Sequence, residues 1–202
     1  MPRIPQKLLL ASLLGFLLGV AWVFSMRFIL YMPDEVHYHA NFGVFINGQR
    51  EMFTGPGYYE EVSACSQDES ANPRGRVHMH QPDSDVVHVH DAGATWGNLF
   101  ENIGLNLTNG SVQTAQGIFI GGQGGELVFM LNGQRTRSIA NVVIGDEDRL
   151  LISFGPAGAD LQTQYDQVAD TAGVFNESYD PAGCTSSNEP TLTERFKHAI
   201  SF

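Results

Sequence analysis

VHMHQPDSDVVHVHD, residues 77–91, is the stretch on which the fold and the site of this chain both depend. It contains two His-x-His pairs, and a third pair lies upstream in EVHYHANF. Because side chains alternate between the two faces of a strand, each pair places its imidazoles on one side, about 7 Å apart. The six histidines of these pairs are His37, His39, His78, His80, His88 and His90.

Residues 77–91 read as a β-hairpin, and its register decides whether the histidines meet. In an antiparallel hairpin the numbers of paired residues have a constant sum. An even sum, for example with His78 opposite His90 and His80 opposite His88, puts all four rings on one face with opposed Cβ atoms about 4.5–5.5 Å apart. An odd sum sends the two pairs to opposite faces. The loop QPDSDV leaves both registers open.

Two Asn-Gly pairs predict tight hairpins on either side of this segment. Asn47-Gly48 and Asn132-Gly133 each follow an apolar run, and each precedes Gln-Arg. Both residue types accept the positive φ angles of a type I′ turn, so we expect two-residue hairpin loops at both places.

One main helix is predicted at about residues 95–104. Thr95 is a good N-cap, apolar residues recur at helical spacing through Ile103, and Gly104 is a stop signal. A hairpin and a last strand at residues 149–154 follow. We therefore predict an α+β, β-grasp-like domain with a mostly antiparallel sheet and one main helix.

The N-terminal segment predicts a transmembrane signal-anchor. Residues 8–26 carry no charge, close to the ~20 residues that a helix needs to cross a bilayer. Arg3 and Lys7 precede this run, so the positive-inside rule puts the N-terminus in the cytoplasm and the chain after Pro33 outside. A cleaved signal peptide is the alternative, although its apolar core is usually only ~7–15 residues long. Both readings export the rest of the chain, and the anchored one is a single-pass plasma-membrane protein.

Three regions follow from these signals. Residues 1–33 are the cytoplasmic stub and anchor, residues 34–156 the His-rich domain, and residues 157–202 a polar C-terminal tail. The tail is expected to be extended, with a short helix near LTERFKHAI.

The exported part is strongly acidic. Removing Arg3, Lys7 and Arg27 from the 11 basic residues leaves eight against all 22 acidic residues, so its net charge is −14. Such a surface repels nucleic acid and attracts cations, which excludes nucleic acid as a partner.

The two cysteines, Cys65 and Cys184, form an even count in an oxidising compartment. A disulfide between them is predicted, and it would tie the tail to the domain. Two free thiols, or a copper ligand among them, are the alternatives.

The histidines are candidate ligands of a transition metal ion, because two or three imidazole nitrogens at about 2.0–2.1 Å can hold one ion. Asp83, Asp85 and Asp91 are candidates for further ligands, or for acceptors that orient a ring. An imidazole and carboxylate set suits copper or zinc, with copper favoured by the Irving–Williams order. A proton-responsive patch and a hydrogen-bonded network without metal are the other readings of the same residues.

At the level of the whole protein, the leading hypothesis is a membrane-anchored, extracytoplasmic copper- or zinc-binding protein that binds, delivers or senses the ion. The alternative is a non-catalytic accessory subunit that docks on a membrane-protein partner and has structural histidines. No nucleophile elbow, phosphate-binding loop, dinucleotide fingerprint or Cys-x-x-Cys occurs in the sequence. A metalloenzyme with an open position on a three-histidine ion is a third hypothesis.

HYHANFGVFINGQ and HMHQPDSDVVHVHDAGATWGNLFENIGL together resemble an uncharacterised group of single-anchor exported proteins of bacteria and archaea. These carry a His-x-His strand ending in Asn-Gly, a second hairpin with three further histidine positions and a helix of the type TLGQFF. The resemblance covers about residues 36–155 and implies a shared architecture and a shared histidine site, with no established activity. His90, Gln81 and Asp85 depart from the pattern by replacing an acidic residue, an Asp and a Gly. The histidines that match it are His37, His39, His78, His80 and His88.

Overall fold

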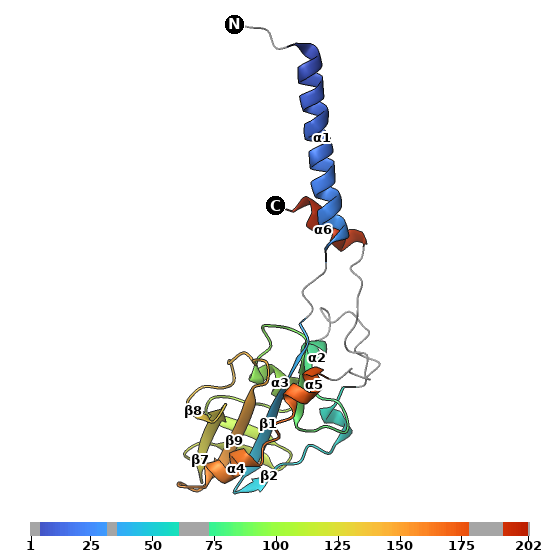
Figure 1. The fold of residues 1–202 in the computed structure, drawn as a ribbon. Helices are drawn as coiled ribbons and strands as arrows, with labels where there is room; N and C mark the ends of the chain where they lie inside the picture. The colour runs from blue at the N-terminus through green and yellow to red at the C-terminus, as the bar shows by residue number, and fades with distance from the viewer. Residues whose placement is uncertain (1–4, 32–35, 61–72, 178–191, 202) are drawn as a thin grey trace. The chain divides into compact units, whose positions relative to one another are not determined.

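The computed structural model describes residues 5–31, 36–60, 73–177 and 192–201, and Figure 1 shows the course of the chain. The chain forms two compact units, one of residues 1–34 with 187–202 and the other of residues 35–186. Cys65 and Cys184 lie outside the described residues, so their disulfide stays a prediction.

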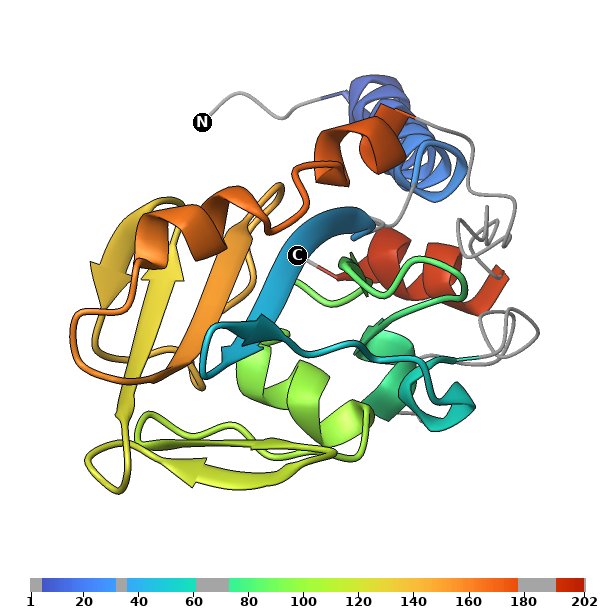
Figure 2. The ribbon, with the colours of Figure 1, turned by 90° about the horizontal axis from the view of Figure 1, so that it is seen from below.

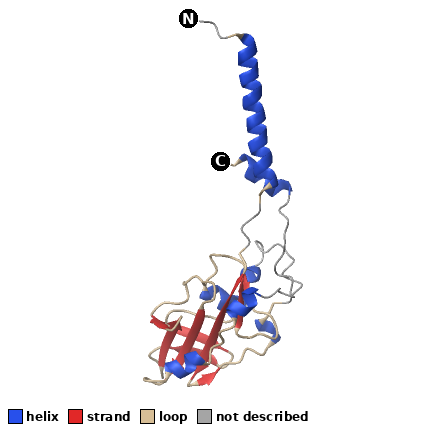
Figure 3. Cartoon of the chain, in the orientation of Figure 1, coloured by secondary structure: helices blue, strands red, loops and turns tan. Residues whose placement is uncertain are grey.

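The unit of residues 35–186 is built on a seven-stranded sheet, and Figure 3 draws its strands in red. Six of these strands are hydrogen-bonded in the order β3-β4-β1-β9-β7-β8, and the seventh, β2, pairs with β1. β1 and β9 run parallel in the middle, and the other pairings described in this sheet are antiparallel. The predicted α+β class is therefore confirmed. The strands are β1 (Tyr38–Ile46), β2 (Gln49–Arg50), β3 (Val77–His78), β4 (Val86–Val89), β7 (Glu126–Leu131), β8 (Gln134–Thr136) and β9 (Arg149–Gly155). A separate two-stranded sheet pairs β5 (Ser111–Thr114) with β6 (Gly117–Ile120).

Both predicted Asn-Gly turns are confirmed. Asn47 and Gly48 have φ angles of 52° and 81° and connect β1 to β2. Asn132 and Gly133, with φ angles of 51° and 76°, connect β7 to β8 in the same way. These positive angles match the type I′ geometry whose twist suits a two-residue hairpin.

The first face of the sheet packs on α3 (Trp96–Asn102), which begins where the sequence predicts. The side chain of Thr95 accepts a hydrogen bond from the backbone N–H of Asn98, and the side-chain oxygen of Asn98 accepts one from the backbone N–H of Thr95. A core cluster joins apolar residues of α3 to alternate residues of the strands. Its fully buried large side chains include Phe42, Met79, Trp96, Leu99, Phe100, Phe129, Ile139 and Ile152.

The second face of the sheet carries two short helices, α4 (Leu161–Asp166) and α5 (Ala172–Glu177), and Figure 2 shows them on the side of the sheet opposite α3. Leu161 and Val168 pack against Phe45 and Leu151 in a second core cluster. Both helices come from the segment that the sequence assigns to a polar tail, so residues 161–177 are part of the packed domain.

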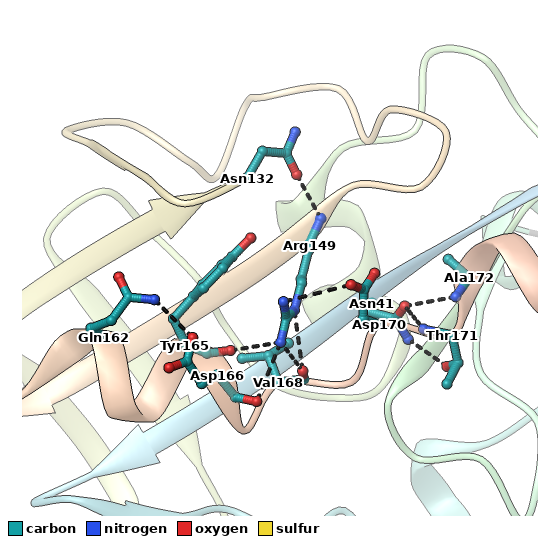
Figure 4. A network of polar contacts seen from close by, with 10 residues as sticks. All are labelled: Asn41, Asn132, Arg149, Gln162, Tyr165, Asp166, Val168, Asp170, Thr171 and Ala172. Atoms are coloured by element: carbon teal, nitrogen blue, oxygen red, sulfur yellow. Dashed lines mark hydrogen bonds and ion pairs between the residues drawn. The ribbon is translucent and has the colours of Figure 1, made fainter.

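Arg149 fastens α4 to the sheet through backbone carbonyls, as Figure 4 shows. Its guanidinium donates to the oxygen of Tyr165 at 2.9 Å and to that of Val168 at 3.1 Å, and it lies 4.5 Å from the centre of the Tyr165 ring. Asp170 lies 3.8 Å from the same group. The carbonyls at the C-terminal end of a helix have no partner within the helix, so a guanidinium there satisfies them and also complements the helix dipole.

Asn41 fastens the start of α5, and it is 1% exposed. Its side-chain oxygen accepts from the backbone N–H groups of Thr171 and Ala172, both at 2.8 Å. Its amide nitrogen donates to the carbonyl of Asp85 at 3.0 Å and to the hydroxyl of Thr171 at 3.1 Å. The one buried side chain therefore ties the segment after α4 to β1 and to the start of β4.

The other unit contains α1 (Gln6–Ile29) and α6 (Leu192–Ile200). α1 is long and apolar enough to cross a membrane. α6 coincides with the short helix predicted near LTERFKHAI.

Replacing Asn41 with alanine should destabilise the domain, because it leaves the backbone N–H groups of Thr171 and of the buried Ala172 without their acceptor. We expect a loss of about 2–4 kcal/mol in the free energy of unfolding, measured by denaturant titration. The exposed Asn141→Ala serves as the matched control and should change stability by less than about 0.5 kcal/mol. Equal effects of the two substitutions would contradict the anchoring role of Asn41.

Candidate metal centre

The register of the strands brings the three His-x-His pairs onto one face of the sheet. In β3 and β4, His78 lies opposite His88. In β1 and β4, His39 lies opposite the same His88. The sum of the paired residue numbers in this hairpin is therefore even, as a shared face requires. His78 lies opposite His88, whereas the example given from the sequence has His78 opposite His90.

The six rings form one continuous cluster across β3, β4 and β1. Ring centres are 4.5 Å apart for His39 and His88, and 4.6 Å for His80 and His88. His90 stacks between His37 at 4.7 Å and His78 at 5.1 Å. The exposed fractions of His39, His78, His80 and His88 lie between 2% and 6%, and those of His37 and His90 are intermediate.

Burial of the alternate residues explains why the histidines share a face. Val77, Met79, Val87 and Val89 have no exposed area and lie in the core cluster with α3. Since successive side chains of a strand point to opposite faces, the histidines between them point to the second face, where α5 lies. The ring of Phe175 in α5 lies 5.7 Å from that of His39.

Backbone carbonyls fix the rings of His78 and His80. Nδ1 of His78 lies 2.8 Å from the oxygen of Arg74, and Nδ1 of His80 lies 3.0 Å from that of Glu60. A carbonyl only accepts, so both Nδ1 atoms donate, and in the neutral rings both Nε2 atoms carry lone pairs. These two Nε2 atoms are 3.0 Å apart. Two lone pairs repel at this distance, and a cation between them, either a proton or a metal ion, would relieve that repulsion.

Asn176 of α5 fixes the ring of His39. Its Oδ1 accepts from the backbone N–H of His39 at 3.0 Å and lies 2.8 Å from Nδ1 of that ring. Its amide nitrogen donates to Asp146 at 2.8 Å, which agrees with this orientation of the amide. Nδ1 of His39 is therefore the protonated nitrogen, and Nε2 is left with a lone pair 3.1 Å from Nδ1 of His88.

The nitrogen positions fit a metal ion. Two nitrogens that bind one ion at about 2.0–2.1 Å with an angle of about 90–110° lie about 2.8–3.4 Å apart. The His78–His80 pair at 3.0 Å and the His39–His88 pair at 3.1 Å both fall in this range. Among the described residues, His37, His39 and His88 form a triad that could hold a metal ion, with ligand atoms within 4.8 Å of one another.

Two of the three aspartates that the sequence offers as ligands or ring acceptors form ion pairs with arginines instead. Asp91 binds Arg76 at 2.7 Å and accepts from the backbone of Gly93, and these bonds lower the pKa of Asp91. Asp85 binds Arg50 at 2.8 Å. Asp83 is exposed. The Nδ1 atoms of His39, His78 and His80 contact Asn176 and the carbonyls of Arg74 and Glu60 instead.

Sequence reasoning did not find Asn176. It lies in the segment assigned to the tail, and it reaches His39 only because Arg149 and Asn41 hold residues 165–172 on the sheet. No spacing or composition signal links Asn176 to a histidine 137 positions away.

Comparison with known proteins adds no relative: no family model, curated protein or solved structure matches the chain.

Burial and crowding keep two of the imidazoles neutral. Burial, reinforced by the neighbouring rings of His39, His80, His78 and His37, moves the pKa of His88 far below its usual range. Burial and the same kind of repulsion lower the pKa of His90 to about 3. A neutral imidazole is the form that binds a metal ion, so both rings stay competent as ligands in mildly acidic solution.

The depressed pKa values predict that the metal-free protein loses stability in mild acid. The unfolded chain takes up protons on these histidines near pH 6.5, while the folded chain does not. As the pH falls below about 6.5, the free energy of unfolding therefore decreases by about 1.4 kcal/mol per pH unit for each such histidine. Denaturant titrations of the full chain in detergent with a chelator, between about pH 7.5 and 5.5, measure this slope.

His90→Gln should make that pH dependence shallower, because it removes one of the two groups. His198→Ala, a change in α6 far along the chain, should leave it unaltered. A stability that stays constant over this pH range would contradict the neutral state of the buried rings.

Proposed function

We propose that this protein is a membrane-anchored, extracytoplasmic binding protein for a transition metal ion, copper or zinc, and that it binds, delivers or senses the ion. The observation that carries the proposal is the close approach of imidazole nitrogens whose lone pairs face one another. Nε2 of His78 faces Nε2 of His80 at 3.0 Å, and both Nδ1 atoms are committed to carbonyls. The adjoining triad of His37, His39 and His88 supplies further nitrogens.

The donor set supports a transition metal over calcium or magnesium. Those hard cations prefer carboxylate, carbonyl and water oxygens, whereas imidazole nitrogen suits copper, zinc, nickel and iron. The Irving–Williams order places copper(II) above zinc for such ligands, so copper is the stronger candidate where both are supplied.

Burial of the ligands supports holding an ion rather than reacting at it. Catalytic sites keep an open coordination position for water or substrate. Here four of the six rings are at most 6% exposed. A role in storage, transfer or sensing suits a closed site of this kind.

The membrane part of the proposal is supported by α1 and its flanks. Residues 6–29 form a continuous helix with an apolar composition, and Arg3 and Lys7 precede or begin it while the acidic residues follow it. The positive-inside rule then places residues 35–186 outside the cytoplasm.

We also propose that the domain is a variant of the β-grasp fold. The neighbouring order β4-β1-β9-β7-β8 supports this relationship, with β1 and β9 parallel at the centre and α3 on one face. The His-bearing β3 would be an addition at one edge of that arrangement.

A docking subunit with structural histidines is the second candidate. The hydrogen bonds to Arg74, Glu60 and Asn176 favour it, because they would also orient a proton-linked network without metal. The metal content of the protein separates the two candidates.

Full-length protein purified in detergent without a polyhistidine tag should carry about one or more equivalents of copper or zinc per chain, by elemental analysis. His39→Ala/His88→Ala should lose this metal, because it removes two members of the triad. The matched control is His198→Ala, which removes a histidine outside the cluster and should keep full occupancy.

Folding must be checked alongside, since both replaced rings are buried. His39→Gln/His88→Gln keeps the bulk of the side chains and should still fold by circular dichroism while losing the metal. A parent protein that stays metal-free after incubation with each ion in turn would overturn the proposed function in favour of the docking subunit.

Asn176→Ala should weaken metal binding while leaving every ligand in place. The outer partner of a ligating histidine fixes its tautomer and its direction, and its loss typically costs about 10–100-fold in affinity. The neighbouring Glu177→Ala is the matched control on the same helix and should leave the affinity unchanged. Competition against a chromophoric chelator measures both, and equal affinities would show that Asn176 does not orient the site.

A further inference from the structure

The C-terminal ends of α1 and α6 cap each other. Arg195 of α6 donates to the carbonyls of Phe28 and Ile29, at 3.2 and 2.9 Å. Arg27 of α1 donates to the carbonyl of His198 at 2.9 Å and to that of Ser201. The last carbonyls of each helix have no partner within the helix, so each arginine satisfies the open end of the other helix.

A ring contact and a buried methyl group strengthen this junction. The ring of Tyr31 stacks on that of His198, with centres 4.4 Å apart and planes 21° from parallel. Ala199 is 3% exposed. α6 is therefore held directly against the last turn of α1.

The remaining large apolar side chains of α6 form an exposed stripe. Leu192, Phe196 and Ile200 are 75%, 60% and 50% exposed. They are spaced four residues apart and so lie along one face of the helix. Arg195 and Lys197 lie outside this row, which makes α6 an amphipathic helix with basic residues among its polar ones.

We infer that α6 lies in the boundary between headgroups and acyl chains of the bilayer that α1 crosses, with Leu192, Phe196 and Ile200 buried in lipid. The inference rests on the membrane-spanning part of the proposed function and is independent of its metal-binding part. It assigns a lipid-contacting role to a segment that the sequence places in a polar tail.

Position, length and chemistry identify lipid as the occupant of the stripe. The carbonyls of Phe28 and Ile29 end the apolar run of α1, so α6 is fastened at the depth where a span leaves the hydrocarbon. Nine residues make a helix about 14 Å long, which is too short to cross a bilayer but suits lying in its surface. Tyr31, Arg27 and Lys197 are residue types that favour the interface, where their polar ends reach water or headgroups.

The consequence is a second attachment of the chain to the membrane. Residues 35–186 form one unit, and the chain on both sides of it leads into the unit of α1 and α6. The histidine domain would then be tied to the membrane at its start and at its end.

Tryptophan quenching by brominated lipid tests the inference on the full chain. The protein has two tryptophans, Trp22 in α1, which is 65% exposed, and Trp96 in the core, which is fully buried. In a Trp22→Phe background, Phe196→Trp reports on the apolar stripe and Lys197→Trp on a neighbouring position outside it. Each chain is reconstituted in phosphatidylcholine vesicles brominated either near the headgroup or at the middle of the acyl chain.

We expect headgroup-proximal bromine to reduce the emission added by Phe196→Trp at least about twofold, and mid-chain bromine to reduce it less. The emission added by Lys197→Trp should be affected much less, and Trp22→Phe alone should show only the constant signal of Trp96. The inference would be overturned if Phe196→Trp were not quenched, or if Phe196→Trp and Lys197→Trp were quenched equally.

The native Trp22 separates this failure from failure of the anchor. If mid-chain bromine quenches Trp22 but neither lipid quenches Phe196→Trp, α1 crosses the bilayer and the inference about α6 is wrong. If Trp22 is not quenched, the membrane-spanning proposal fails and the inference fails with it. Metal content, measured on the same preparations, reports on the histidine site independently of both.

Discussion

The double pairing of β4 is the constraint from which the site follows. His88 lies opposite His78 on one side and opposite His39 on the other, so three strands present their histidines to the same face. A slip of one residue in either pairing would turn a whole strand over and send its histidines into the apolar core. Val87 and Val89 prevent such a slip, because their complete burial against the α3 side is lost if β4 turns over. The hydrophobic core thus fixes the geometry of a polar cluster on the opposite face.

The second face is organised by polar side chains that bind backbone atoms. Arg149 holds the C-terminal end of α4, and Asn41 holds the first N–H groups of α5. α5 then carries Asn176 to the ring of His39. The position of α5 depends on the contacts of Arg149 and Asn41, and the contact of Asn176 with His39 depends on the position of α5. The tautomer of His39 is therefore set by contacts that begin at Arg149 in the central strand β9. Few apolar contacts are needed on this face because the buried hydrogen bonds are satisfied at both partners.

Features of the fold and of the histidine site could be predicted from the sequence where a few neighbouring residues determine them. The alternation of His-x-His, the two Asn-Gly turns and the Thr95 cap are local signals, and the structure has each element where the sequence places it. Register is a property of two strands and their loop, and six loop residues between His80 and Val87 left its parity open. The packing of α4 and α5 was missed because Leu161, Val168 and Ala172 are its main apolar contacts, too few to stand out in a polar segment. The aspartates near the histidines were natural candidates as ring acceptors, but Arg76 and Arg50 bind two of them.

The charge of the ligand set bears on which ion the site would accept. An imidazole ligand contributes no negative charge, so a divalent ion would bring its full charge into the largely buried ring cluster, and the cost of burying an isolated charge is high. Two features offset that cost. Asn176 is hydrogen-bonded to Asp146 on one side and to the ring of His39 on the other. The carboxylate of Asp146 can therefore polarise His39 through Asn176 without binding the ion itself. The chain from Asp34 onward also carries a net charge of −14, whose field favours any cation in the domain. A monovalent copper ion would need less of this compensation than a divalent one, because the cost of removing an ion from water rises steeply with its charge.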